Sequence, residues 1–174
     1  MFSDAIGAVQ AYIELGGFVI YLIAGLALLM WTLVLERLLY YYGGGLNRDV
    51  ATAIDAWESR SERVSWHAHK VREKLISEVT ERVNAYLPMI KTTVALAPLF
   101  GLLGTVTGMI NVFEVMAITG GGDARQMATG VFTATVPTLS GMVVAIAGVF
   151  GDNLVSRKAS NETALLEDHL TMDH

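Results

Sequence analysis

Three long apolar blocks, separated by polar segments, organise this chain of 174 residues. They are the uncharged runs 16–35, 92–113 and 126–151. Each is long enough to cross the hydrocarbon core of a bilayer, which takes about 20 helical residues. We therefore expect an all-α integral membrane protein with three transmembrane helices. Three spans can hardly enclose an aqueous path alone, so a homo-oligomer, a partner protein or both are expected as well.

The positive charges predict the orientation of these spans. Eleven of the twelve Lys and Arg residues fall between the first two spans or after the third, and only Arg125 falls in the other compartment. Cytoplasmic loops carry the excess of Lys and Arg. We therefore expect an outer N-terminus, a cytoplasmic segment 43–90, an outer turn at 117–125 and a cytoplasmic C-terminus. In a bacterial inner membrane, the outer side is the periplasm.

The pattern divides the chain into five segments. An N-terminal amphipathic helix at the periplasmic interface carries apolar residues at Phe2, Ile6, Val9 and Ile13. The predicted segments are this helix, 1–15; the first transmembrane helix, 16–42; a cytoplasmic helical segment, 43–90; a transmembrane hairpin, 91–154; and a cytoplasmic C-terminal helix, 155–174. The hairpin turns at the Gly-rich linker 119–123.

The polar segment predicts a long stalk. A capping box at Ser59–Glu62 starts a helix that we expect to run without a break from Ser61 to Phe113, about 80 Å. The second and third helices would thus extend far into the cytoplasm. Further expectations are an aromatic belt at Tyr40, Tyr41 and Tyr42, an ion pair between Glu78 and Arg82, and packing of Leu165, Leu166 and Leu170 against the stalk.

Small and polar residues form one strip on each hairpin helix. On the second span the strip is Ala97, Gly101, Gly104, Gly108 and Asn111, with Thr105 beside it; on the third it is Gly130, Ala134, Pro137, Thr138, Gly141, Ala145 and Gly148, with Thr133 at its edge. In one interpretation these strips are helix–helix contacts, where small residues let backbones approach. In the other, Thr105, Thr133 and Thr138 line a narrow path and offer hydroxyls to water or an ion. The pattern alone leaves both open.

Other chemistry finds little support in the sequence. There is no cysteine, no Walker loop, no Ser/His/Asp set and no HExxH motif. His67 and His69 are two residues apart, which is poor spacing for a metal site on a helix. Glu114, beside the second span, is expected to sit hydrated at the outer interface, and a role in a proton relay is the alternative. We therefore expect no enzymatic activity, no cofactor, no metal and no nucleic-acid partner.

The second span, Ala97-Pro98-Leu99-Phe100-Gly101-Leu102-Leu103-Gly104-Thr105-Val106-Thr107-Gly108-Met109, closely resembles the signature of the MotA/TolQ/ExbB proton channel family. The third span, from Gly130 to Ile146, is similar to the same family. Within the family, the chain most resembles a short ExbB of the TonB system.

This resemblance implies a mechanism and a set of partners. ExbB-like subunits form a pentamer around transmembrane helices of an ExbD-like partner, which supplies a membrane aspartate. Protons moving down their gradient drive motion, and a TonB-like protein carries the work to outer-membrane receptors for siderophores and similar nutrients. A TolQ-like role in outer-membrane integrity, another kind of stator, and a structural membrane scaffold that conducts no ions are the alternatives.

The resemblance also assigns roles to residues. Thr105 and Thr138 match the family's pore threonines. Thr133 stands where many relatives have a glutamate, so the proton-accepting carboxylate would be the partner's aspartate alone. Pro137 stands where many relatives have another residue, and it would free a backbone carbonyl one turn earlier. Gly101, Gly104, Gly108, Asn111 and Gly141 complete the set of pore or packing candidates.

Overall fold

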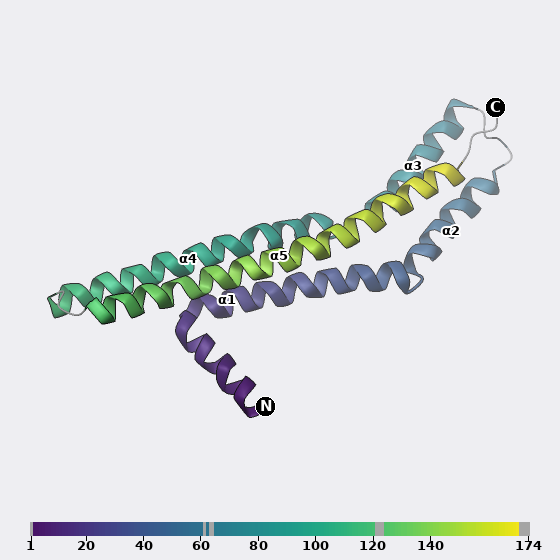
Figure 1. Ribbon diagram of the computed structural model, residues 1–174. Helices are drawn as coiled ribbons and strands as arrows, with labels where there is room; N and C mark the ends of the chain where they lie inside the picture. The colour runs from purple at the N-terminus through teal and green to yellow at the C-terminus, as the bar shows by residue number, and fades with distance from the viewer. Residues whose placement is uncertain (1, 61, 63–64, 121–123, 171–174) are drawn as a thin grey trace. The chain divides into compact units, whose positions relative to one another are not determined.

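The computed structural model describes residues 2–60, 62, 65–120 and 124–170, and these residues are helical apart from short connections (Figure 1). The helices are α1 Phe2–Tyr42, α2 Gly45–Glu58, α3 Trp66–Val83, α4 Leu87–Thr119 and α5 Ala124–His169. Three stretches are long and apolar enough to cross a membrane: Gly16–Tyr42, Trp66–Ile118 and Met127–His169. The predicted all-α fold with three membrane-crossing helices is confirmed.

Helix α1 consists of two straight parts joined at Gly17. The backbone there has φ 60° and ψ −155°, a conformation that costs glycine little and other residues much. Figure 1 shows the resulting bend, after which α1 runs on to Tyr42. The side chains of the predicted apolar stripe before the bend, at Phe2, Ile6, Val9 and Ile13, lie outside the described residues.

The chain divides into two compact units. The first, here called the hairpin unit, comprises Met1–Trp31 and Lys91–Val149, and the second, the arm unit, comprises Thr32–Ile90 and Phe150–His174. In the hairpin unit, α4 and α5 run antiparallel and side by side, and α1 packs on them (Figure 1). The buried side chains of α1 in this unit are Val19, Ile20, Ile23 and Met30.

The outward surface of the hairpin unit is apolar. Its exposed side chains include Phe18, Leu28, Leu99, Ile110, Phe132, Val143 and Ile146. A helix surface of this kind suits a lipid or protein environment and not water, because exposed apolar patches of this extent are rare on soluble monomers.

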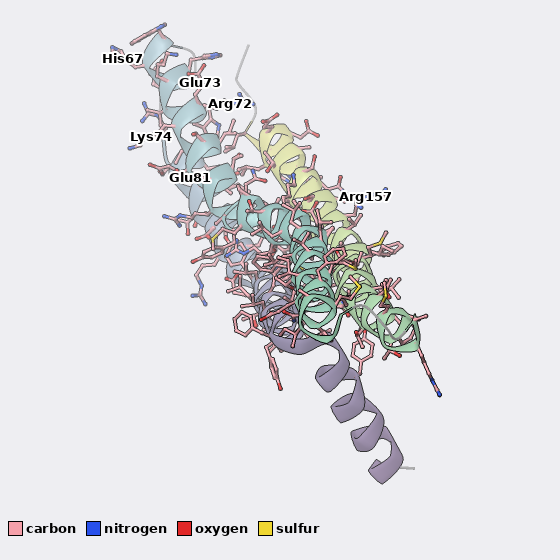
Figure 2. All side chains as sticks on the ribbon, turned by 90° about the vertical axis from the view of Figure 1, so that its left-hand side faces the viewer. His67, Arg72, Glu73, Lys74, Glu81 and Arg157 are labelled. Atoms are coloured by element: carbon pink, nitrogen blue, oxygen red, sulfur yellow. The ribbon has the colours of Figure 1, made fainter. Side chains whose placement is uncertain are left out.

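The arm unit packs α2, α3 and the end of α5 through a small apolar core. Its buried side chains are Leu46, Trp57, Ala68, Val79, Val83, Val155, Ala159, Leu166 and Leu170. Arg72 of α3 donates to the backbone carbonyls of Leu170 and of Glu167, the latter at 3.0 Å. Figure 2 shows Arg72 reaching toward the end of α5, whereas Lys74 points away.

The predicted packing of the C-terminal leucines is confirmed in part. Leu166 and Leu170 are buried in the arm unit, but Leu165 is 52% exposed. Leu165 and Leu166 are consecutive, so their side chains point to different sides of α5. A helix that packs along one face can bury only one of the two.

The prediction of an unbroken helix from Ser61 to Phe113 is wrong. Helix α3 ends at Val83 and α4 begins at Leu87. Between them Tyr86 adopts φ 64°, the left-handed conformation that ends a helix. Pro88 then falls in the first turn of α4, where a missing N–H costs nothing. It therefore marks a new start and not a kink.

The capping box predicted at Ser59 is also wrong. Ser59 is the C-terminal cap of α2. The N-cap of α3 is Ser65, whose hydroxyl oxygen accepts a hydrogen bond from the Ala68 N–H at 3.3 Å. Glu62 accepts from the Ser65 N–H at 2.6 Å, so it stabilises the approach to α3 and not its first turn.

The predicted pair of Glu78 and Arg82 does not form. Arg82 pairs with Asp49 of α2 at 2.9 Å, and Glu78 pairs with Lys74 at 3.5 Å. Arg82 therefore pairs with a carboxylate on a neighbouring helix and not with Glu78 on its own helix. A pair along one helix is worth only about 0.2–0.5 kcal/mol.

Of the three tyrosines predicted to form an aromatic belt, only Tyr42 has a side chain that is largely exposed, at 77%, and its place in a belt stays a prediction. Tyr41 is buried and donates its hydroxyl to the Val83 carbonyl at 2.9 Å, and Tyr40 donates to the Asp49 carboxylate. These two rings are therefore parts of the arm unit's interior, where their hydroxyls find partners.

Candidate functional site

The seam between α4 and α5 is built from residues too small to keep the helices apart. Thr138 of α5 donates its hydroxyl to the Gly101 carbonyl of α4 at 2.9 Å. A methyl group added at Gly101 would lie 2.9 Å from the Thr138 Cα and 3.0 Å from the Pro137 carbonyl oxygen. The two backbones are therefore in contact, and only glycine fits at position 101.

The same close approach repeats along the hairpin. A Cβ at Gly108 would lie 2.6 Å from the Ala134 Cβ, and one at Gly141 would lie 3.1 Å from the Gly101 Cα. Gly104 faces Pro137 in the same way. The predicted strips on the two helices thus face each other within one chain. Small residues of this kind let membrane helices associate by van der Waals packing.

Thr105 and Thr133 use their hydroxyls differently from Thr138. Thr105 donates to the Leu102 carbonyl of its own helix at 2.7 Å. Thr133 donates to the carbonyls of Gly130 at 2.8 Å and Thr129 at 3.0 Å, also in its own helix. A hydroxyl has one proton to donate and two lone pairs that accept. With the proton committed to the backbone, each of these half-buried oxygens can only accept from a further group.

The three threonines do not share one surface. Gly101 and Thr105 are four residues apart, so they lie on the same face of α4, and Thr138 contacts Gly101 there. Thr133 precedes Thr138 by five residues, which places it about 140° away around α5. The structure therefore brings Thr105 and Thr138 to one side of the seam and Thr133 to another.

Pro137 and Asn111 each leave a polar group without its usual partner. Pro137 is buried within α5 and has no N–H, so the Thr133 carbonyl lacks its helical donor. The Asn111 carboxamide is exposed, and it makes no hydrogen bond among the residues that the structure describes. Glu114, one turn further on, is exposed as well. Contact between any of these groups and an ion stays a prediction.

One residue that the sequence did not single out is Arg37, which is only 4% exposed. Its Nη1 donates to the Arg82 carbonyl at the end of α3, at 3.0 Å. Its guanidinium also lies over the rings of Tyr40 and Tyr86, with 4.8 Å and 4.9 Å from Cζ to the ring centroids. The signal in the sequence was an arginine set among aromatic residues at the end of an apolar run, which is typical of a span end as well.

The comparisons with known proteins agree with this architecture. The model of the MotA/TolQ/ExbB proton channel family matches residues 45–168, well over half of the chain. An ExbB-like biopolymer transport protein of Synechocystis sp. is 51% identical over 61 residues, which are 33% of this chain and 24% of the relative. The biopolymer transport protein exbB1 of Vibrio cholerae is 34% identical over 96 residues, 55% of this chain and 42% of the relative.

A third relative comes from another branch. The Tol-Pal system protein TolQ of Pseudomonas aeruginosa is 32% identical over 84 residues, 48% of this chain and 36% of the relative. The matched segments thus span less than half the length of each of these three relatives. Together with the three apolar helices, they show a multi-pass membrane protein. The chain belongs to the MotA/TolQ/ExbB proton channel family.

Proposed function

We propose that this chain is the channel subunit of a proton-driven motor that energises TonB-dependent transport across an outer membrane. The observation that carries the proposal is the α4–α5 seam. The uncharged runs of two helices, each apolar enough to cross a membrane, meet there through glycines and a threonine hydroxyl. Hydroxyls hydrate a narrow path at far lower cost than a buried charge.

The proposal requires a partner that carries the proton. The runs 92–113 and 126–151 contain no titratable side chain, and threonine does not titrate near neutral pH. An ExbD-like protein with an aspartate in its membrane helix would supply that group. Thr105 and Thr138 would lie near the carboxyl, and Thr133 would be a polar contact only. The accepting oxygens of Thr105 and Thr133 suit a donor such as a protonated carboxyl or water.

Three spans are too few to surround a partner helix, so the proposal includes a homo-oligomer, and we infer a pentamer from the family. The assembly would sit in a bacterial inner membrane with a periplasmic N-terminus and a cytoplasmic C-terminus. The cations of the chain support this orientation, because eleven of twelve fall on one side. The arm unit would then lie in the cytoplasm. We propose no enzymatic activity for the chain.

The energy scale fits a mechanical step. One elementary charge that crosses the membrane yields about 2.3 kcal/mol per 100 mV. A few protons could therefore drive a rearrangement worth several kcal/mol. In the proposed function a TonB-like protein carries this work to receptors for siderophores and similar nutrients.

The first test replaces Thr138 by valine, which keeps the shape of the side chain and removes the hydroxyl. The hydrogen bond to Gly101 is expected to contribute only about 0.6 kcal/mol, so the complex should still assemble. A deletion strain complemented with Thr138→Val should fail to grow on siderophore-bound iron as the only iron source. Thr138→Ser, which restores the hydroxyl, should support growth.

The matched control is Thr135→Val on the same helix. The Thr135 hydroxyl donates to the Phe132 carbonyl of its own helix, and the side chain points to the exposed surface. Growth should be normal with this variant. If Thr138→Val grows normally on siderophore iron, the proton path past Thr138 is refuted, and the chain acts as a structural scaffold.

The similarity to a Tol-Pal system protein favours a second candidate, a TolQ-like role in outer-membrane integrity. The same strains distinguish the two. A deletion strain that grows on siderophore iron but becomes sensitive to detergent supports the TolQ-like role and not the TonB-type motor.

A further inference from the structure

The outer half of α4 carries a line of polar side chains to which the proposed function assigns no role. Thr107, Asn111 and Glu114 follow one another at spacings of four and three residues, so they lie on one face of the helix. All three are exposed in the chain. Val106 and Phe113, 51% and 57% exposed, lie seven residues apart on a different face at the same depth. The surface of α4 is thus split into a polar line and an apolar side.

The Asn111 carboxamide indicates that this polar line requires a hydrogen-bonding environment. Burial of an amide in hydrocarbon without a hydrogen bond costs about 4–8 kcal/mol. Thr107 avoids such a cost, because its hydroxyl donates to the carbonyls of Leu103 at 2.9 Å and Gly104 at 3.1 Å. The Asn111 carboxamide has no such partner among the described residues. It must therefore face water or a polar group of another molecule, and the carboxylate of Glu114 carries the same requirement.

The polar line continues the face of the hairpin on which α1 packs. Gly104 faces Val19 of α1, since a Cβ at Gly104 would lie 3.3 Å from the Val19 Cγ1. Thr107 follows Gly104 by three residues and so lies on that same face. On α5, the Ser140 hydroxyl lies 2.6 Å from the Tyr12 hydroxyl of α1.

Thr133 joins the polar line from α5. It precedes Ser140 by seven residues, two helical turns, and so lies on the α5 face that α1 covers at Ser140. Its hydroxyl proton is committed to its own helix, so its oxygen is free to accept.

Helix α1 does not cover this face in the outer half of the hairpin. It bends away at Gly17, close to Val19 and hence to the level of Gly104, while α4 runs on to Thr119 (Figure 1). Those 15 residues extend about 22 Å beyond that level. The polar side chains start at the level where α1 bends away, so the described residues leave their face open toward the outer side.

We propose that Thr107, Asn111 and Glu114 of α4, with Thr133 of α5, line a water-filled vestibule through which protons approach the middle of the membrane from the outer side. The passage of protons rests on the proposed function, but the hydration of the vestibule does not. Glu114 lies at its mouth and Thr107 at its inner end, about 10 Å apart along the helix axis.

The chain has no cysteine, so single cysteines report on this surface without interference. Asn111→Cys and Thr107→Cys are expressed with the partner proteins in cells and treated from outside with a positively charged, membrane-impermeant methanethiosulfonate. Val106→Cys and Phe113→Cys are the matched controls, because they lie at the same depth on the apolar side. Labelling is read as a mass shift of the purified chain.

Asn111→Cys and Thr107→Cys should react at least about ten times faster than both controls, because only the thiolate reacts and it forms in water and not in hydrocarbon. Equal rates at all four positions, or no labelling at the two polar positions, would overturn the vestibule. Disulfide-linked dimers of Asn111→Cys on mild oxidation would overturn it too, since the line would then be a contact between two copies.

The labelling does not depend on growth, so the two proposals can fail separately. Normal growth of Thr138→Val would refute the proton path while fast labelling of Asn111→Cys still showed a hydrated surface. Asn111→Leu tests the two proposals together. Its apolar side chain of similar volume should exclude water from the polar line and abolish growth on siderophore iron, whereas Asn111→Gln should preserve growth. Normal growth of Asn111→Leu would refute the vestibule as the route of the protons.

Discussion

Arg37 offers the sharpest test of how the arm unit is held together. Its Nη1 donates to the Arg82 carbonyl at 3.0 Å, and its Nε and Nη2 bond both carboxylate oxygens of Glu36 at 2.6 Å and 2.8 Å. The rings of Tyr40 and Tyr86 lie within 5 Å of its guanidinium. A buried cation thus meets the negative pole of α3 at its C-terminus. We predict that Arg37→Gln loosens the junction between α3 and α4.

The size of the effect follows from the contacts that are lost. A hydrogen bond from a charged donor contributes about 1.5–3 kcal/mol. Two cation–π contacts add about 0.5–1 kcal/mol each at partly exposed sites. The pair with Glu36 adds nothing to the sum, because that carboxylate is half exposed and screened by water. The junction should therefore lose about 2.5–5 kcal/mol, which raises the population of its open state roughly 70-fold to several thousand-fold.

Hydrogen–deuterium exchange of the full chain in lipid measures this opening directly. Amides of the segment 80–87 should exchange faster in Arg37→Gln by the factor given above, while amides within α2 and the middle of α4 keep their rates. Tyr41→Phe removes only the hydroxyl that donates to the Val83 carbonyl. A neutral hydrogen bond is worth about 1 kcal/mol, so this variant should accelerate exchange only about fivefold.

Arg157→Gln is the matched control, because Arg157 is an exposed arginine of the same unit (Figure 2). It removes the same charge from the chain without touching the junction. Unchanged exchange over 80–87 in Arg37→Gln, or equal acceleration in Arg157→Gln, would refute the reasoning. In the first case the end of α3 is held by apolar packing alone; in the second, the net charge sets the opening.

Two further predictions concern packing and capping. Gly141→Ala puts a methyl group against the Ala97 carbonyl oxygen and 3.1 Å from the Gly101 Cα, so it should lower the stability of the detergent-solubilised protein by about 1–3 kcal/mol in thermal unfolding. Gly25→Ala meets nothing within 4 Å and should be neutral or slightly stabilising, and equal loss in both variants would contradict the seam. Ser65→Ala removes the N-cap of α3 and should cost about 1 kcal/mol, seen as faster exchange of the first-turn amides. Ser65→Thr keeps a hydroxyl that can both cap α3 and donate to Glu62, so it should retain slow exchange, and fast exchange in this variant would count against the cap.

The membrane-crossing helices could be predicted because their signal is local. An uncharged apolar run of about 20 residues matches the thickness of the hydrocarbon core and is rare in helices that face water. The hairpin turn followed from consecutive glycines, and α4 indeed ends at Thr119 and α5 begins at Ala124. The facing strips of small residues could be predicted too, since helical spacing places them on one side of each helix.

The break at 84–86 could not be predicted in this way. Val79, Val83 and Tyr86 keep the helical spacing, so the pattern runs on as if the helix did. The groups that stabilise the break, Arg37 and Tyr41, lie more than 40 residues earlier in the chain. A helix end that depends on distant donors leaves no periodicity signal, and the tertiary contact overrides the local pattern.

The function of the candidate site could not be predicted from its threonines, and Asn111 is the more informative residue. A threonine in a span can satisfy its hydroxyl on its own helix, as Thr105 and Thr133 do, or on a neighbour, as Thr138 does. Each arrangement is stable without water, so the presence of threonines cannot separate a pore from a packed seam. An asparagine amide has two N–H donors, and the Asn111 amide donates to no carbonyl among the described residues, whereas each of these threonine hydroxyls has a partner. Asn111 therefore says more about where water or a partner reaches this protein than any of the threonines in its seam.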